Sequence, residues 1–445
     1  MPSIPGPTTE GSKTWSPEHL VGDDNNSSET WKKIHTHLNS NEFRSAITTA
    51  FELPPGDNFT YHATASVNLG QVDAAIHAGR ANGLHAWYVK SAPASVSTST
   101  STSDSLPEDG GNKKQQEETD RESSTIPGFP SLRIAGYPPT NDIQAYISIF
   151  DPTKSAANSL KSLSANAKKG SLRATVAEYL SSKRYLDPSI VVPKLKVPAS
   201  SPKSSGGGQQ NPALDFWAYS CLALEYAGPN ADTALVPASH HMLPVYMHHF
   251  GCVVPSYEAL QIIKNLSTSI STSRSNNNNN NNNNSNNSSS SNISNSVLDM
   301  GSGNGYWTLM LRKLGVDAVA VDSGQSRWRT TWIPDTVVAD GVQYLRRRSG
   351  CPDVAVLLLV YPIVGGEFTR KVIEAYAGSV IVVAGTQNGN GYTGFRDMMI
   401  DEYMAREKPD WEKVASVALP SFAGKDDALF AFRRKKRDDV DKSIK

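Results

Sequence analysis

Residues 297–307 read VLDMGSGNGYW, and this stretch decides the expected fold. Two apolar residues, Val297 and Leu298, lead to Asp299 and then to a turn with glycine at positions 301, 303 and 305. Glycine lets the backbone bend and admits a ligand where a β-carbon would clash. Residues 306–314 predict a helix, whose N-terminus offers unpaired amide groups to a negatively charged group. The stretch therefore predicts a strand, a turn and a helix that together bind a small molecule.

The glycine spacing separates two kinds of cofactor. A dinucleotide-binding fingerprint reads G-x-G-x-x-G and would require glycine at position 306, which is tyrosine, so NAD is disfavoured. The stretch instead resembles the first motif of the class I S-adenosylmethionine-dependent methyltransferases, an acid followed by G-x-G-x-G. The resemblance implies a Rossmann-like fold, S-adenosylmethionine as the cofactor, and transfer of its methyl group to an acceptor that the sequence does not identify.

The rest of the C-terminal half matches the same family in order. Expected strands lie at 318–321, 336–339, 354–360 and 379–383, with a helix at 367–376 and two closing strands at 411–419 and 427–433. The run at 354–360 is almost wholly apolar, as a central parallel strand covered on both faces requires. A closing antiparallel hairpin distinguishes the methyltransferase sheet from an NAD-binding one. The expected fold class is α/β: a Rossmann-like, seven-stranded methyltransferase sheet with a C-terminal antiparallel hairpin, a mainly helical N-terminal region and disordered linkers.

The resemblance also implies which positions bind the cofactor. Asp322 follows the second strand and would hold the ribose hydroxyls, while Asp340 and Gly341 follow the third and would lie beside the adenine. The implied cofactor-binding set is Asp299, Gly301, Ser302, Gly303, Gly305, Tyr306, Asp322, Asp340, Gly341 and Tyr361. Structural alternatives remain open: Asp322 could cap a helix, Asp340 could serve a turn, and Tyr306 and Trp307 could belong to the core.

The sequence says less about the methyl acceptor and about a catalytic base. Methyl transfer needs the nucleophile in line with the C–S bond and, for a protonated nucleophile, a base. Amino-directed methyltransferases often carry Asn or Asp, followed by Pro-Pro-Tyr or Pro-Pro-Phe, after the fourth strand. This chain has Tyr361 and Pro362 at that place and lacks the amide or acid. The difference argues against an adenine or a glutamine amide as the acceptor. Tyr361 could orient a substrate or act as a weak base, but a phenol normally titrates at about 10, so a packing role is at least an equal alternative. No catalytic residue is assigned.

Two further segments have both a functional and a structural interpretation. The loop after the fifth strand could line a substrate mouth or form a plain glycine-rich turn; its residues are Asn388, Gly391, Tyr392, Thr393 and Gly394. The basic run at 433–437 could serve nuclear import or nucleic-acid binding, but a solvated charged tail is the simpler interpretation.

Composition divides the chain into units. The expected units are a disordered segment 1–28, a helical region 29–91, a disordered linker 92–126, a small α+β or helical region 127–197, a linker 198–212, a methyltransferase-like domain 213–437 with an Asn/Ser-rich insertion 267–296, and a tail 438–445. Within 127–197 we expect a strand at 145–150 and a helix at 171–182. The segments 39–47 and 68–76 loosely resemble the turn between the two helices of a tetratricopeptide repeat. The distance between the two segments is shorter than the length of that repeat, so an ordinary helical hairpin is favoured.

Charge and special residues exclude several classes. The 43 basic and 43 acidic side chains cancel, which argues against general nucleic-acid binding. The three cysteines lack both disulfide and metal spacing, and the first residues lack the basic start and apolar run of a signal peptide. No apolar run approaches the length of about 20 residues that a membrane helix needs. We therefore expect an intracellular protein, cytoplasmic or nuclear, without a membrane partner.

Four histidines lie close together in the sequence and invite a metal interpretation. They are His240, His241, His248 and His249. No Cys, Asp or Glu accompanies them at ligand spacing, and Pro244 interrupts a shared helical face, so no metal is expected.

Two other functions compete with methyl transfer. A catalytically silent relative could keep the fold as a binding or scaffold protein; the missing acceptor motif favours this alternative, while the intact glycine turn and the two acids count against it. The N-terminal helices could also bind a protein partner, although the sequence shows no helical repeat at constant spacing.

Overall fold

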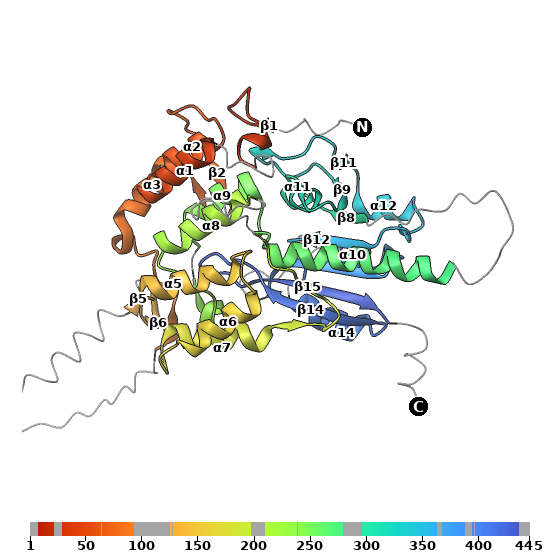
Figure 1. The fold of residues 1–445 in the computed structure, drawn as a ribbon. Coiled ribbons are helices and arrows are strands. Elements are labelled where there is room, and N and C mark those ends of the chain that lie inside the picture. Colours follow the sequence, from red (N-terminus) through yellow and green to blue (C-terminus); the bar gives the residue numbers. More distant parts are fainter. Residues whose placement is uncertain are drawn as a thin grey trace, which may run out of the picture.

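The computed structural model describes residues 8–21, 29–63, 65–92, 125–126, 128–196, 210–237, 239–278, 296–362, 367–387, 394–395 and 397–435. Most of the expected linkers, the insertion, the tail and residues 388–393 of the candidate substrate mouth lie outside these residues. Within the described part, a large mixed sheet is packed between helices, so the expected α/β class is confirmed (Figure 1).

The sheet has eight strands. They are β7 (Tyr185–Leu186), β8 (Ser296–Met300), β9 (Asp317–Asp322), β11 (Val337–Val338), β12 (Val356–Val360), β13 (Val380–Thr386), β14 (Trp411–Ala418) and β15 (Asp427–Arg434). Their order is β11-β9-β8-β12-β13-β15-β14-β7. Seven strands were expected; the eighth, β7, comes from the region before the candidate domain and pairs with the edge strand β14 through two residues.

Strand direction creates a binding edge. The strands from β11 to β13 are parallel, whereas β15 runs antiparallel to both β13 and β14. From β8 the chain first proceeds outward through β9 to β11, then returns to the other side of β8 to form β12 and β13. Open α/β sheets bind ligands outside the carboxyl ends of the strands at such a switch in direction. This edge holds the turn that follows β8.

Side-chain alternation along the strands supplies two cores. In β12, Val356 and Leu358 face one core while Leu357 and Leu359 face the other. The helices α12 (Gly341–Arg346), α13 (Phe368–Ala375) and α14 (Ile400–Glu407) contribute to the second core. The first core includes α10 (Tyr257–Asn278), α11 (Tyr306–Lys313) and the N-terminal half of the chain. Burial on both faces explains why β8 and β13 are buried throughout.

The N-terminal half packs onto the sheet rather than forming a separate module. Its first elements after β1 (Thr8–Thr9) are η1 (Pro17–His19), α1 (Glu29–Asn39), α2 (Phe43–Ala50), a hairpin of β2 (Tyr61–His62) and β3 (Ser66–Val67), α3 (Leu69–Ala78) and η2 (Gly79–Asn82). A small sheet of β4 (Val89–Ser91), β5 (Thr125–Ile126) and β6 (Phe129–Ile134) follows. In Figure 1, α1–α3 and the later α5–α7 flank α8 and α9, and all of these helices contribute to the first core.

The connecting helices complete this half. They are α5 (Thr140–Ile147), η3 (Ser148–Phe150), α6 (Ala156–Ala165), α7 (Leu172–Lys183), α8 (Pro212–Ala223), η4 (Ala231–Leu235) and α9 (Met242–Phe250). The expected helix at 171–182 is confirmed as α7. The two repeat-like phrases lie at the starts of α2 and α3, and the β2–β3 hairpin separates them, so α1 and α2 form an ordinary helical pair.

Several expectations differ from the structure. The region 29–91 is helical only in part, since it contains β2, β3 and β4, and the first residues of the expected insertion 267–296 belong to α10. Two further expectations were wrong. The strand expected at 145–150 is helical, in α5 and η3, because Ile143, Tyr146 and Phe150 are buried at helical spacing. The segment 1–28 was expected to be disordered, yet its residues 8–21 include β1 (Thr8–Thr9), which pairs with β10 (Thr330–Thr331). Trp15 and Leu20 bury their side chains there and anchor a segment whose overall composition is polar.

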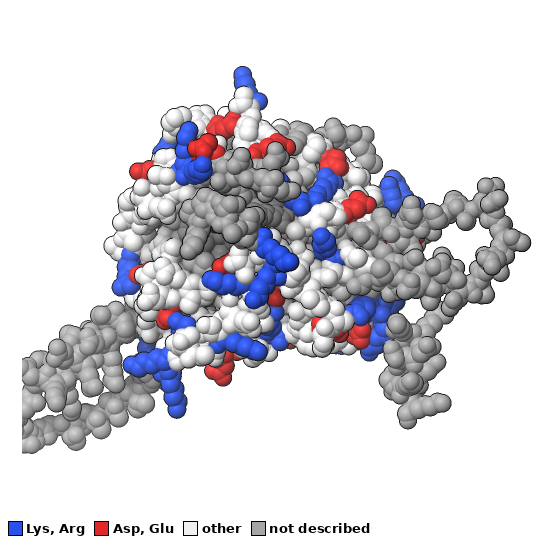
Figure 2. Space-filling view, viewed as in Figure 1, with Lys and Arg blue, Asp and Glu red and all other residues white. Residues whose placement is uncertain are grey.

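The described surface carries both signs of charge. On the face shown in Figure 2, basic and acidic side chains are interspersed. Among the described helices, none combines the length and apolar character required to cross a membrane.

Candidate functional site

The turn between β8 and α11 depends on its three glycines. Gly301, Gly303 and Gly305 have φ values of +76°, +58° and +81°, a region that side-chain-bearing residues rarely adopt. Space is also restricted: a β-carbon would lie 2.4 Å from Cγ1 of Ile333 at Gly305, and 2.9 Å from Cζ2 of Trp328 at Gly303. At Gly301 no atom would lie within 4 Å. The glycine pattern is therefore required by the backbone and, at two positions, by close packing.

Asp322 ties the end of β9 to this turn. Its Oδ2 accepts a hydrogen bond from the amide of Gly303 at 3.0 Å, and its Oδ1 accepts one from the amide of Gly324 at 2.7 Å. Each carboxylate oxygen has two lone pairs, so both can accept another hydrogen bond. Asp322 thus ties the turn to the loop after β9 and keeps acceptor capacity for a ligand; it does not cap a helix, which was its structural alternative.

Asp299, in β8 just before the turn, has a buried carboxyl group with too few hydrogen-bond partners. Its side chain is 0% exposed, Oδ2 accepts a hydrogen bond from the hydroxyl of Thr308 at 2.7 Å, and Oδ1 has no partner among the described residues. Burial and, to a smaller extent, the nearby charge of Asp322 raise the pKa of this carboxyl to about 7, against the opposing effects of the Thr308 hydrogen bond and the charge of Arg312. The hydroxyl of Ser302 is likewise buried and unpartnered within the described part of the chain. Unpartnered buried polar atoms are uncommon and indicate a ligand, a water or strain.

The remaining predicted residues divide between the edge and the core. Asp340 is exposed and caps α12, accepting a hydrogen bond from the amide of Gln343 at 2.8 Å. Gly341 is buried, and a β-carbon there would lie 2.4 Å from the sulfur of Met300. Both residues follow β11, which pairs with β9, so they lie farther along the same edge than Asp322.

Tyr306 is not brought to the open side of the turn. Its side chain is 0% exposed; the hydroxyl donates to Oδ1 of Asn211 at 2.7 Å and accepts from the amide of Ala213 at 3.2 Å. Trp307 is also buried, with its indole donating to the carbonyl of Val253 at 2.9 Å. These two side chains anchor α11 to the N-terminal half, which is the structural alternative for both.

Tyr361 lies in a second polar cluster at the same edge. It follows β12 with a φ of +48°, and the ammonium of Lys425 lies 3.4 Å from its hydroxyl and 4.5 Å from the centre of its ring. Burial raises the pKa of this phenol, which makes it a poorer base at neutral pH. Nearby Asp427, the first residue of β15, is 0% exposed, and both its carboxylate oxygens lack a partner in the described structure. Burial raises the pKa of Asp427 to about 7 despite the opposing charge of Lys425.

Sequence reasoning missed Lys425, Asp427 and Trp328. A signal for the first two existed, because charged residues at 425–427 interrupt an otherwise apolar hairpin. Trp328 had no such signal, since its proximity to Gly303 depends on a loop with no regular periodicity.

Two of the four histidines, His240 and His249, have buried side chains in the core. His249 is 0% exposed, with Nδ1 2.7 Å from the hydroxyl of Thr330 and Nε2 3.0 Å from the hydroxyl of Tyr61. His240 stacks on Phe422, and burial lowers its pKa to about 3, so its ring is neutral. Within the described residues, no group of three or more His, Cys, Asp or Glu side chains could hold a metal ion.

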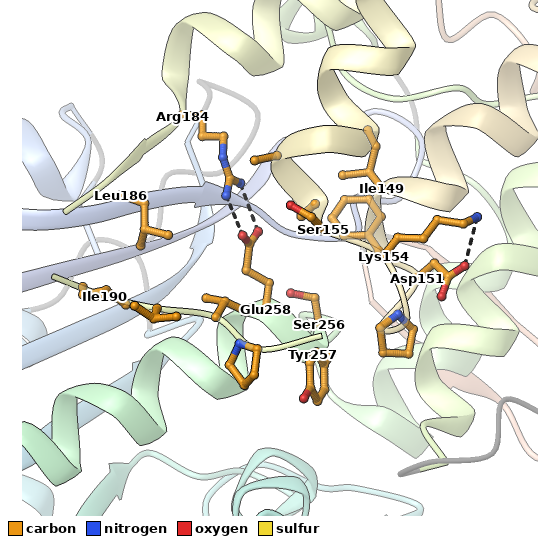
Figure 3. Close-up of a pocket in the computed structure, with 17 residues that line it drawn as sticks. Ile149, Asp151, Lys154, Ser155, Arg184, Leu186, Ile190, Ser256, Tyr257 and Glu258 are labelled. Carbon is orange, nitrogen blue, oxygen red and sulfur yellow. Dashed lines mark hydrogen bonds and ion pairs between the residues drawn. The ribbon is translucent and has the colours of Figure 1, made fainter. Parts of the chain in front are cut away.

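A cavity of about 300 Å³ lies elsewhere, between η3, the start of α6, the segment after β7 and the start of α10 (Figure 3). Its charged groups already pair with one another: Arg184 binds Glu258 in a bidentate ion pair, and Lys154 lies 3.0 Å from Asp151. None of its lining residues belongs to the glycine turn.

Comparison with known proteins leaves the family open. No protein-family model matches the chain, and no curated protein matches it. The structure of a Burkholderia thailandensis 1,6-didemethyltoxoflavin-N1-methyltransferase with bound 1,6-didemethyltoxoflavin and S-adenosylhomocysteine is 15% identical, covering 32% of this chain and 71% of that chain at a TM-score of 0.26. A structure described as the conversion of a disulfide bond into a thioacetal group during echinomycin biosynthesis is 16% identical, covering 34% and 80% at a TM-score of 0.24. At such TM-scores neither likeness decides the fold or the function.

Proposed function

We propose that this protein is an S-adenosylmethionine-dependent methyltransferase with a Rossmann-like sheet, acting on an acceptor still to be identified. The observation that carries the proposal is the three-glycine turn at the carboxyl end of β8, at the switch in strand direction, with Asp322 of β9 hydrogen-bonded to its central glycine. The antiparallel β15, inserted between β13 and β14, supports a methyltransferase rather than a dinucleotide-binding sheet.

The residues at the turn fit such a cofactor. Asp322 has lone pairs for the ribose hydroxyls, Oδ1 of Asp299 is a spare acceptor for a cationic group, and the Ser302 hydroxyl can donate or accept. The N-terminus of α11 favours the carboxylate end of the cofactor through the helix dipole. When bound, S-adenosylmethionine supplies an electrophilic methyl group, so the protein's main task is to align the acceptor.

The second polar cluster suits the acceptor side. Asp427 is the candidate base of this cluster, because burial raises its pKa to about 7 and both its carboxylate oxygens lack a partner within the described residues. Lys425 and Tyr361 supply a cation and an aromatic face beside it. The cluster lies at the end of β12, the neighbour of β8, so acceptor and cofactor would meet at one edge of the sheet.

Replacing Asp322 by asparagine is expected to weaken S-adenosylmethionine binding by about 10- to 100-fold, since hydrogen bonds to a charged group contribute about 1.5 to 3 kcal/mol. Asparagine keeps the size of the side chain and one acceptor oxygen, which preserves much of the turn. Isothermal titration of S-adenosylmethionine and S-adenosylhomocysteine into the full chain measures the effect.

The matched control is Asp335→Asn, which removes an exposed carboxylate paired with Arg312 and should leave affinity unchanged. Failure of the folded wild-type protein to bind either compound would reject the methyltransferase proposal and favour the scaffold alternative. If binding occurs, transfer of a radiolabelled methyl group into a cell extract, reduced in Asp322→Asn, separates an enzyme from a silent binding protein. An intracellular location and a protein partner on the N-terminal helices stay predictions.

A further inference from the structure

Trp328 occupies a particular place beside the glycine turn. It ends the exposed loop 323–327 that follows β9, and its own side chain is half-buried. A β-carbon on Gly303 would lie 2.9 Å from Cζ2 and 3.3 Å from Cε2 of the indole. The indole therefore lies directly against the central glycine of the turn, on the backbone that a ligand would approach.

The polar atom of this indole has no partner. Trp328 Nε1 is buried and makes no hydrogen bond within the described part of the chain, and the same holds for the hydroxyl of Ser302, the residue before Gly303. Other buried tryptophans are satisfied: the indole of Trp217 donates to the carbonyl of Ser421 and that of Trp332 to the carbonyl of His249. Because buried N–H groups are rarely left unpaired, the free donor of Trp328 points to a missing acceptor.

The next residue fixes the position of Trp328. The guanidinium of Arg329 binds both carboxylate oxygens of Asp57, at 2.6 and 2.7 Å, and donates to the carbonyl of Glu10 at 3.0 Å. The backbone of Arg329 is also paired, since its amide donates to the carbonyl of His248 and its carbonyl accepts from the amide of Glu10. The N-terminal half thus holds the end of the loop through several hydrogen bonds to Arg329, while residues 323–327 are exposed.

We propose that Trp328 is a cofactor-binding residue, whose indole contacts the S-adenosyl group over Gly303 and whose Nε1 donates a hydrogen bond to it. This inference rests on the proposed function. An aromatic face attracts a sulfonium or ammonium cation and stacks on a purine, and either contact suits this cofactor. Because Arg329 is hydrogen-bonded to Asp57 and Glu10, the indole of Trp328 would already be in position before the ligand binds.

The test compares two substitutions of Trp328 in the full chain by isothermal titration with S-adenosylhomocysteine and S-adenosylmethionine. Trp328→Ala removes both the face and the donor and should weaken binding by about 10- to 50-fold, whereas Trp328→Phe keeps a face and should weaken it by about three- to tenfold. The control Trp411→Phe changes a tryptophan in the distant strand β14 and should bind as the wild type does. Quenching of tryptophan fluorescence by the ligand should be smaller in Trp328→Phe than in Trp411→Phe.

The outcomes separate the two proposals. If the wild type binds and both Trp328 variants, shown to be folded by circular dichroism, bind equally well or more tightly, the inference about Trp328 is wrong while the proposed function stands. If the folded wild type binds neither compound, the proposed function fails and this inference fails with it.

Discussion

Replacing Arg329 by methionine is expected to lower the free energy of unfolding by about 3 to 5 kcal/mol, because it leaves a carboxylate without its partner in a desolvated site. The side chain of Arg329 is 2% exposed and that of Asp57 is 10% exposed. Methionine retains the apolar stem of arginine but not the guanidinium, so the loss reports the ion pair together with the hydrogen bonds to the Glu10 carbonyl and the Tyr61 hydroxyl. Urea unfolding followed by circular dichroism measures the difference.

A second ion pair in the same part of the chain provides the control. Arg312 and Asp335 approach to 2.8 Å, but their side chains are 32% and 56% exposed, so Asp335→Asn should change stability by less than about 1 kcal/mol. The double variant Asp57→Asn with Arg329→Met should be more stable than the sum of the two single losses predicts, because it leaves no unpaired charge. A loss for Arg329→Met as small as that for Asp335→Asn would show that this ion pair does not hold the N-terminal half to the sheet.

The central strands and their order along the chain were predictable because each carries a strong local signal. β12 and β13 are apolar runs of the length that a strand buried on both faces requires, and the glycines after β8 mark a turn whose positive φ values other residues rarely adopt. The strand expected at 336–339 is represented by Val337 and Val338 in β11, and the closing hairpin by β14 and β15. Local composition and periodicity therefore suffice to predict an element whose environment is uniform along its length.

Pairings between distant short segments were not predictable. β1 and β10 contain two residues each, and so does β7, which is too short for any periodicity. The site has the same limitation: Lys425 meets Tyr361, and Trp328 meets Gly303, only because the sheet edge and the N-terminal half bring their loops together. Tyr306 illustrates the opposite case, since a residue inside the predicted binding motif has its side chain in the core.

Stability and cofactor affinity should respond in opposite directions to Asp299→Asn. The folded protein raises the pKa of Asp299 to about 7 from an ordinary value of 3.8, so between these values it holds a proton that the unfolded chain has lost. Stability therefore falls as the pH rises through this window, and the penalty is complete above about pH 7. Asparagine is neutral throughout. The free energy of unfolding of the Asp299→Asn variant, relative to that of the wild type, should therefore rise by about 2 to 3 kcal/mol between pH 5 and pH 8. Urea unfolding at the two pH values measures this change.

Cofactor affinity, in contrast to stability, should be higher in the wild type than in Asp299→Asn. An ionised Asp299 with an unpartnered Oδ1 attracts a cationic ligand, so Asp299→Asn should weaken S-adenosylmethionine binding by about tenfold or more at pH 8, and wild-type affinity should rise from pH 6 to pH 8 as the carboxyl ionises. Asp335→Asn again serves as the control, because its carboxylate is exposed and paired with Arg312. If the pH dependence of stability is unchanged in Asp299→Asn, the raised pKa is wrong. If stability changes as expected and affinity does not, Asp299 shapes the turn without contacting the cofactor, and a buried charge at this position must be explained by the fold alone.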